Sequence, residues 1–184
     1  MAQPILTTER LLLRAYRDGD FDGIHAYASD PLVCRFVTFG PNAPEQTREW
    51  MAQVKKWSEE EPLRHYEFLV TLKDSGQVIG STGLTLDVQS PKAEVGYCFA
   101  KAYWGRGYAT EAVKAVLSFA FGVLKLHRVS APVALDNKAS ANVAGKCGMT
   151  REGRFRQSHF IKGSWWDIDY YAMLDVDWQQ NNDQ

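Results

Sequence analysis

The sequence predicts one α+β domain, and three observations support this prediction. The chain has 184 residues, which is enough for one domain with a substantial core. After residue 108 the apolar side chains repeat at helical spacing, and before it the pattern is that of consecutive strands rather than repeated βαβ units. No internal repeat or linker divides residues 1–184, so we expect a core over 7–176 and a frayed tail over 177–184.

The first part of the chain predicts a strand and two helices. Asp18 is a candidate N-cap, because its carboxylate can accept a hydrogen bond from a free N–H of the first helical turn. Three prolines and a glycine interrupt regular structure over residues 30–44. The expected elements are a strand over 11–15, a helix that buries Phe21, Ile24 and Ala28, the loop over 30–44, and a helix over 45–60.

The central helix has the clearest pattern, with one apolar face formed by Ala109, Ala112, Val113, Val116, Leu117, Ala120, Phe121 and Leu124. Turn-forming clusters around Ser75 and Pro91 separate the strands that precede it. The other elements expected in this part of the chain are strands over 67–72, 78–86, 93–99 and 127–133, a short helix over 139–147, and closing strands over 150–156 and 166–174.

A glycine-rich turn containing Gly105 and Gly107 joins the strand at 93–99 to the central helix. Free N–H groups at a helix start, with the positive end of the helix dipole behind them, bind anions and above all phosphate. The alternative is a tight turn that needs its glycines for geometry alone.

Three phosphate ligands can be compared by residue type. A nucleoside-triphosphate loop needs a lysine after its last glycine, where this chain has Tyr108 and Ala109. A dinucleotide fingerprint needs a third glycine, where this chain has Thr110, although Asp136 could serve as its acidic residue. The third candidate is coenzyme A, whose pyrophosphate could bind the turn while its pantetheine arm runs back along the preceding strand.

Three spaced motifs resemble one family. Trp104-x-x-Gly107-x-Ala109 matches the acyl-coenzyme A motif Gln/Arg-x-x-Gly-x-Gly/Ala at its last two positions and departs from it at the first. The strings at 8–14 and 103–112, and Asn137-x-x-Ser140-x-x-Val143-x-x-Lys146-x-Gly148-Met149, follow in the right order. The chain therefore resembles the GNAT (N-acetyltransferase) superfamily, in the branch that includes ribosomal-protein N-terminal alanine and serine acetyltransferases.

The resemblance implies a fold, an activity and a co-substrate. The fold is a mixed, mostly antiparallel, splayed sheet of about seven strands flanked by four helices. The activity is direct transfer of an acetyl group from acetyl-CoA to a primary amine, such as the N-terminus of a ribosomal protein. The alternatives are a small-molecule amine (a polyamine, an amino acid or an antibiotic) as acceptor, and a non-catalytic CoA-binding module. The early aromatic residues Phe36, Phe39 and Trp57 are then candidate acceptor contacts, or simply core.

The resemblance also implies a set of residues that bind acetyl-CoA. Backbone groups of the central strand pair with pantetheine, and one N–H, best placed at Phe99, points at the acyl oxygen. Two asparagines bind pantetheine amides, and a lysine binds the ribose 3′-phosphate. The expected residues are Tyr97, Cys98, Phe99, Arg106, Gly107, Tyr108, Ala109, Thr110, Asn137, Asn142 and Lys146.

Catalysis needs a proton for the leaving thiolate and a base for the amine. Many family members carry a tyrosine as the acid at the position of Ala144, and this branch offers Ser140 instead, although a serine there could also be a helix cap. Glu94 is the favoured base and His159 the second candidate. Cys98 as a covalent nucleophile fits the resemblance less well.

Composition limits the partners. Basic and acidic residues nearly balance, 21 against 22, so we expect neither nucleic acid nor a membrane as a partner. The three cysteines form no CxxC pair and no cluster with histidines, and we expect no metal. An odd cysteine count, no secretory leader and no membrane-spanning run predict a cytoplasmic protein. The resemblance implies acetyl-CoA and an amine acceptor as partners, for a monomer or homodimer.

Overall fold

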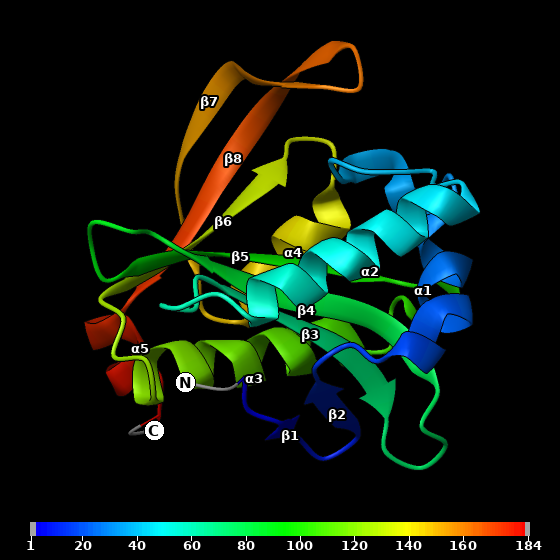
Figure 1. Cartoon of the computed structure of the whole chain (residues 1–184). Coiled ribbons are helices and arrows are strands. Elements are labelled where there is room, and N and C mark those ends of the chain that lie inside the picture. The colour runs from blue at the N-terminus through cyan, green and yellow to red at the C-terminus, as the bar shows by residue number, and fades with distance from the viewer. Residues whose placement is uncertain (1–2, 183–184) are drawn as a thin grey trace.

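The computed structural model describes residues 3–182, which form an eight-stranded sheet with helices on both faces (Figure 1). The strands lie in the order β1-β2-β3-β4-β5-β6-β8-β7. They are β1 (Leu6–Thr7), β2 (Leu11–Arg14), β3 (His65–Leu72), β4 (Val78–Leu86), β5 (Lys92–Phe99), β6 (Arg128–Ala134), β7 (Thr150–Ile161) and β8 (Ser164–Leu174). The helices are α1 (Phe21–Ala28), α2 (Pro44–Ser58), α3 (Tyr108–Gly122), α4 (Lys138–Lys146) and α5 (Asp175–Asn182), with 3-10 turns at Asp18–Asp20, Val33–Phe36 and Lys101–Tyr103.

Neighbouring strands are antiparallel except β5 and β6, which run parallel. The paired stretch of these two strands is short. Within the described chain, β5 pairs with β6 only through Lys92, Ala93 and Glu94. Past Glu94 the two strands separate, while β5 stays paired with β4 as far as Phe99. The predicted α+β fold with a splayed, mostly antiparallel sheet is confirmed.

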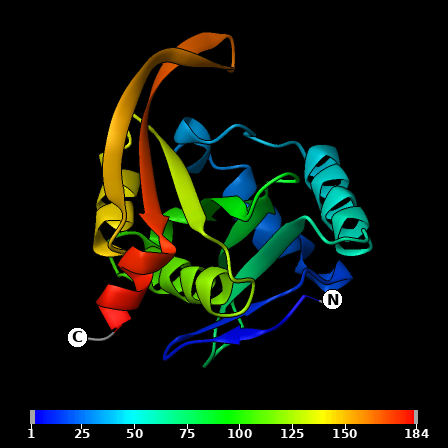
Figure 2. The same ribbon diagram turned by 90° about the vertical axis from the view of Figure 1, so that its left-hand side faces the viewer.

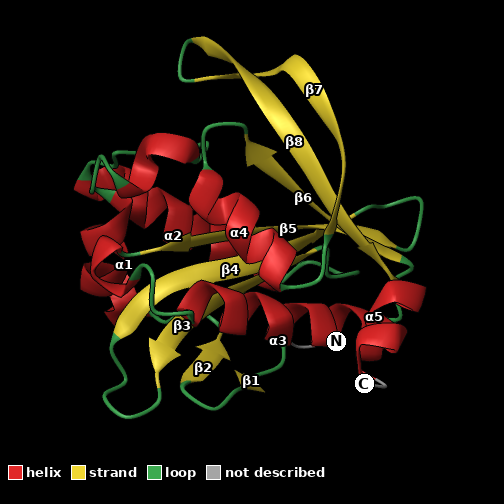
Figure 3. Cartoon of the chain, turned by 180° about the vertical axis from the view of Figure 1, so that it is seen from behind, coloured by secondary structure: helices red, strands yellow, loops and turns green. Residues whose placement is uncertain are grey.

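The two faces of the sheet carry different helices (Figures 1 and 3). The main core lies under α3 and buries its predicted apolar stripe against strand residues such as Phe68 and Val70. A smaller cluster on the other face joins Ile24 and Tyr27 of α1 to Leu69 of β3. Because successive strand residues point to opposite faces, Phe68 and Leu69 mark the α3 face and the α1 face of β3.

The β7–β8 hairpin projects beyond the helices (Figure 2). Both strands are longer than predicted, and they continue almost to the turn at Lys162 and Gly163. Lys162 Nζ donates a hydrogen bond of 2.6 Å to the carbonyl of Cys34, and Phe36 contacts Trp166 edge-on at 6.4 Å between ring centroids. The tip of the hairpin is therefore tied to the loop that follows α1.

Asp18 is not the cap of the first helix, and this prediction is wrong. Asp18 begins a 3-10 turn, and α1 starts only at Phe21. The neighbouring Asp20 is buried instead, and its two carboxylate oxygens accept hydrogen bonds of 2.7 Å from Arg14. Arg14 of β2 therefore binds the carboxylate of Asp20, which does not cap the N-terminus of α1 with its side chain.

The tail differs from its prediction as well. The residues from Asp175 to Asn182 form α5 rather than a frayed segment, and the last two residues lie outside the described chain. Trp178 of this helix stacks on Phe121 of α3 at 5.9 Å between ring centroids. Tertiary packing of one indole ring gives order to a polar segment whose sequence alone predicts none.

Candidate active site

The turn before α3 adopts the backbone conformation that its glycines predict. Gly105 and Gly107 have φ angles of +72° and +83°, in the left-handed region that side chains disfavour. Gly107 is the N-cap of α3, so the next backbone N–H groups, from Tyr108 onward, lack partners within the helix. The predicted stretch from Arg106 to Thr110 therefore combines a left-handed glycine turn with the free amides of a helix start.

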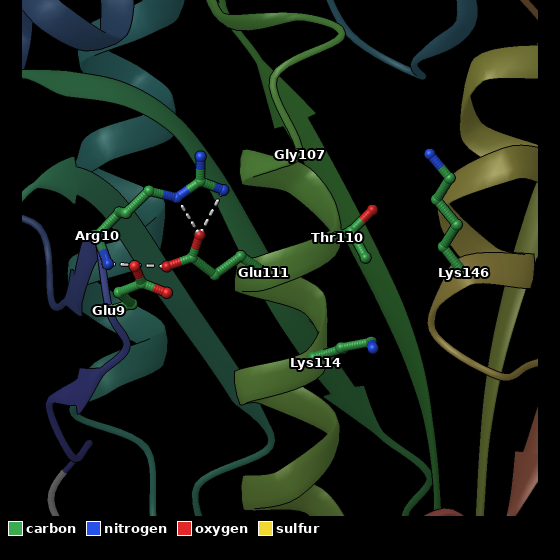
Figure 4. Close-up of a pocket in the computed structure, with 7 residues that line it drawn as sticks. All are labelled: Glu9, Arg10, Gly107, Thr110, Glu111, Lys114 and Lys146. Atoms are coloured by element: carbon green, nitrogen blue, oxygen red, sulfur yellow. Dashed lines mark hydrogen bonds and ion pairs between the residues drawn. The ribbon is translucent and has the colours of Figure 1, made fainter.

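Residues from the start of the chain hold this turn in place (Figure 4). Arg10 donates a hydrogen bond to the carbonyl of Arg106 at 3.1 Å and pairs with Glu111 at 2.6 Å. A side chain at Gly107 would meet the Arg10 guanidinium at 3.3 Å. Burial acts to raise the pKa of Glu111, but hydrogen bonds from Thr8 and Arg10 outweigh it and hold that pKa below its ordinary value. The motif at 8–14 thus positions the turn, a role that the sequence did not indicate.

A hollow of about 570 Å³ opens beside the turn. In Figure 4, Lys146 of α4 lies across a gap from Thr110 of α3, and Lys114 extends from the same helix below it. Neither lysine pairs with a carboxylate in the part of the chain that the structure describes. Two free cations next to a helix N-terminus suit a phosphorylated ligand. The sequence motif indicates Lys146 but not Lys114, which lies one helical turn after Thr110.

The orientation of β5 decides which backbone groups face β6. The N–H of Ala100 donates to Ile79 of β4 at 2.9 Å, and the carbonyl of Gly96 accepts a hydrogen bond from the Thr82 side chain of the same strand. Backbone groups alternate in direction along a strand, so those of Cys98 also point to β4. Cys98, expected among the pantetheine contacts, is engaged in the β4–β5 ladder instead.

The same alternation directs the backbone groups of Tyr97 and Phe99 toward the gap between β5 and β6. Trp104 Nε1 donates a hydrogen bond of 2.7 Å to the carbonyl of Phe99. The indole ring of Trp104, where the family motif carries Gln or Arg, thus engages the end of β5. The N–H of Phe99 is left as the donor nearest to the end of the gap.

Ser140 and Tyr97 face each other across the gap between α4 and β5. The Tyr97 hydroxyl lies 2.8 Å from Ser140 Oγ and 3.0 Å from the Ser140 carbonyl. A tyrosine hydroxyl has one hydrogen, so when Tyr97 donates to the carbonyl, Ser140 Oγ donates to Tyr97. Burial raises the pKa of Tyr97 to about 12 and keeps it protonated.

Asn137, not Ser140, caps α4. Asn137 Oδ1 accepts a hydrogen bond of 3.1 Å from the Ser140 N–H, which leaves the Ser140 hydroxyl free for Tyr97. The alternative reading of Ser140 as a cap is therefore wrong. Ala144, at the position of the usual tyrosine, is fully buried, whereas Asn142 is exposed on the same helix.

Cys98 has the properties of a core residue. Its side chain lies in the cluster under α1. Burial, and to a lesser extent the nearby Cys34, raises the pKa of the Cys98 thiol to about 12. Because the thiolate is the reactive form, this environment makes Cys98 a poor nucleophile.

The two candidate bases lie near each other on the α1 face. Glu94 shares the β5 face of Cys98, four residues earlier, and is the last residue to pair with β6. Burial raises the pKa of Glu94, and the neighbouring charge of His159 from β7 partly lowers it. The Tyr97 side chain points to the other face, so the candidate acid and base approach the gap from opposite sides.

Within residues 3–182, no group of three or more His, Cys, Asp or Glu side chains is arranged to hold a metal ion. The helices described by the structure include none with the length and apolar character needed to cross a membrane.

Two solved structures share this fold. A ribosomal-protein-S5-alanine acetyltransferase from Vibrio fischeri has a TM-score of 0.82 at 22% identity, over 95% of this chain and 98% of that chain. A spermidine N-acetyltransferase from Vibrio cholerae, in complex with CoA and spermine, has a TM-score of 0.79 at 22% identity, over 94% and 99%.

Sequence comparison goes beyond the fold. Residues 10–150 match the family described as the acetyltransferase (GNAT) domain. The chain is 32% identical over 173 residues to the uncharacterized N-acetyltransferase YnaD of Bacillus subtilis, covering 94% of this chain and 98% of the relative. The resemblance predicted from the three motifs is confirmed, and the chain belongs to the GNAT family of acetyltransferases.

Proposed function

We propose that this enzyme transfers an acetyl group from acetyl-CoA directly to a primary amine at the gap between β5 and β6. The observation that carries the proposal is the convergence on this gap of three features: the glycine turn of α3, the Tyr97–Ser140 pair and Glu94. Each supplies one requirement of acyl transfer, namely donor binding, protonation of the leaving group and deprotonation of the amine.

The turn and two lysines bind the phosphates of the co-substrate. The amides from Arg106 to Thr110 hold the pyrophosphate, and Lys146 and Lys114 line the hollow beside it for the ribose 3′-phosphate. The remaining donors of Asn137 and Asn142 on α4 face the pantetheine arm. The residues present suit these contacts, because two lysines without carboxylate partners line the hollow beside the N-terminus of α3.

The end of β5 polarises the acyl carbonyl. Backbone groups of Tyr97 and Phe99 pair with the pantetheine arm, and the Phe99 N–H donates to the acyl oxygen. Trp104 donates to the carbonyl of Phe99, and the Ala100 N–H of the same peptide unit donates to Ile79, so the backbone directly after Phe99 is held on both sides. Main-chain donors need no reorganisation during the reaction and are insensitive to most side-chain substitutions.

Ser140 protonates the leaving thiolate. The Ser140 O–H turns from Tyr97 to the thiolate, and its O–H bond breaks as an S–H bond forms, directly or through one water. The Tyr97 hydroxyl then turns from the Ser140 carbonyl, 3.0 Å away, to Ser140 Oγ, 2.8 Å away, and stabilises the oxygen that has lost its proton. A water molecule returns a proton to Ser140 Oγ after the thiol leaves. Tyr97 thus supports the acid that replaces the usual tyrosine.

Glu94 removes the proton of the incoming amine through water. Burial raises the pKa of Glu94 toward neutral pH, and a carboxylate with a higher pKa is a stronger base. His159 lies close enough to influence that pKa and is the second candidate. A protein N-terminus and a small-molecule amine both satisfy this chemistry.

Release of free thiol from acetyl-CoA in the presence of a panel of primary amines tests the proposal. We expect amine-dependent release by the wild type, and a large loss of kcat for Ser140→Ala. Ser118→Ala, on the exposed side of α3, is the matched control and retains wild-type turnover. Undiminished kcat in Ser140→Ala would contradict the assignment of the acid, and no amine-dependent release at all would contradict the activity.

A further inference from the structure

A second carboxylate, that of Glu67 on β3, faces the same side of the sheet as Glu94. Strand register aligns Glu67 with Gly83 of β4, and Gly83 with Gly96 of β5. Leu69, two residues further along β3, packs under α1, so the Glu67 side chain points to the α1 face. Two glycines therefore separate Glu67 from the edge of β5.

The glycines leave room for a ligand. A Cβ added to Gly83 would lie 2.7 Å from the carboxyl carbon and from both oxygens of Glu67, so this carboxylate lies flat above Gly83. A Cβ added to Gly96 would meet no atom within 4 Å. A surface without side chains thus runs from the Glu67 carboxylate to the edge of β5.

The Glu67 carboxylate has no partner in the described chain. It accepts no hydrogen bond and forms no ion pair there, and burial raises its pKa to about 7. The Tyr16 hydroxyl is buried nearby, with Ser81, Trp50 and Tyr27 around it but no hydrogen bond of good geometry to any described residue. After burial, the charge of Glu67 is the main influence that raises the pKa of Tyr16, so the two groups are close. Buried carboxylates are normally paired, so the unpaired Glu67 carboxylate indicates a ligand.

Aromatic rings border the same region. Trp57 of α2 stacks on His65 of β3, with 4.2 Å between ring centroids, and Trp50 meets Trp57 edge-on at 5.4 Å. Helix α2 packs against β3, so these rings lie beside the strand that carries Glu67. Carboxylates and indole faces are the groups that recognise organic ammonium ions.

We propose that Glu67 and Tyr16, bordered by the α2 tryptophans, bind a second ammonium group of the acceptor, so that the preferred acceptors are aliphatic diamines or polyamines. This inference rests on the proposed acetyl transfer at β5. The reacting amine lies at the edge of β5 and the second charge lies above Gly83. The two ends of the acceptor are separated by one to one and a half strand spacings, roughly 5–7 Å, because Gly83 and the edge of β5 belong to neighbouring strands.

Cadaverine and n-pentylamine test the proposal, because they share a reacting amine and a carbon chain and differ in the second ammonium. We expect the wild type to have at least a tenfold higher kcat/KM for cadaverine. In Glu67→Gln, which keeps the shape and removes the charge, this ratio falls to near one. Gly83→Ala lowers the ratio as well, because its methyl group displaces the carboxylate. Glu49→Gln, exposed on α2, keeps the wild-type ratio.

A binding measurement separates this inference from the activity. Cadaverine should raise the Tm of the wild type more than n-pentylamine does, and this difference should vanish in Glu67→Gln. Equal kcat/KM for the two amines in the wild type, or a ratio that survives Glu67→Gln, would overturn the subsite and leave the acetyl transfer intact. A wild type that shows the Tm difference but acetylates neither amine would support the subsite and contradict the proposed function.

Discussion

Tyr97 and Ser140 illustrate what single residues contribute beyond their motif. Sequence analysis selected Ser140 from its position after Asn137, and it counted Tyr97 only for its backbone. The fold adds the side-chain contact between them, because β5 directs Tyr97 toward α4. Such a contact joins residues 43 positions apart, and no local pattern in the sequence predicts it.

Tyr97→Phe tests the role of this contact. The ring still fits the core, but Ser140 loses the group that stabilises its oxygen after proton transfer. We expect kcat to fall by about tenfold, less than the loss expected for removing the acid itself. The KM for acetyl-CoA should change little, because Tyr97 contributes only backbone groups to the proposed binding of the co-substrate. Stopped-flow thiol release measures both constants, and an unchanged kcat would show that Tyr97 only packs.

Glu67→Gln should also change stability in a pH-dependent way. The folded-state pKa of about 7 lies above the ordinary value of 4.5, so folding is linked to proton uptake, and stability declines as pH rises from about 4 to 7. Glutamine removes this decline. At pH near 8 the variant should gain up to about 3 kcal/mol in unfolding free energy, and near pH 4 it should gain little. Urea unfolding at the two pH values measures this, and equal gains at both would contradict the linkage.

At the scale of elements, periodicity predicted most of the fold. The strand over 78–86 and the central helix were located closely, because their apolar patterns are long and their flanking turns are clear. The short β1 and the polar α5 were missed, since two residues carry no period and a polar helix gains its order from packing. The β7–β8 hairpin is longer than predicted because its outer half, where Phe160 and Trp165 are exposed, is stabilised by cross-strand pairing rather than by burial.

The turn before α3 is held in place by a residue distant from it in the sequence. Arg10 joins the carbonyl of Arg106 to the carboxylate of Glu111. We expect Arg10→Ala to loosen the turn and to raise the Kd for CoA by about tenfold, comparable to the loss of one charge-assisted contact. Calorimetry with CoA measures this. Lys73→Ala, whose exposed ammonium contacts the backbone of the same region, serves as the control, and an unchanged Kd in Arg10→Ala would contradict the role of the clamp.

At the scale of the whole molecule, the sheet separates the residues proposed for the donor from those proposed for the acceptor. The glycine turn, Lys146 and the Tyr97–Ser140 pair lie on the α3 side, whereas Glu94 and Glu67 face the α1 side. The strands β5 and β6, which separate past Glu94, lie between these two sides. Sequence motifs described the donor half, because it depends on a local turn and helix. They said little about the acceptor half, because it is assembled from β3, β4, β5 and α2 by strand register.

The most direct test of this arrangement is NMR titration of the backbone amides with CoA. The account predicts large shifts for the amides from Arg106 to Thr110 and for those of Tyr97 and Phe99, and small shifts in α1 and α2. Shifts confined to other elements, or the absence of any shift at saturating CoA, would contradict it.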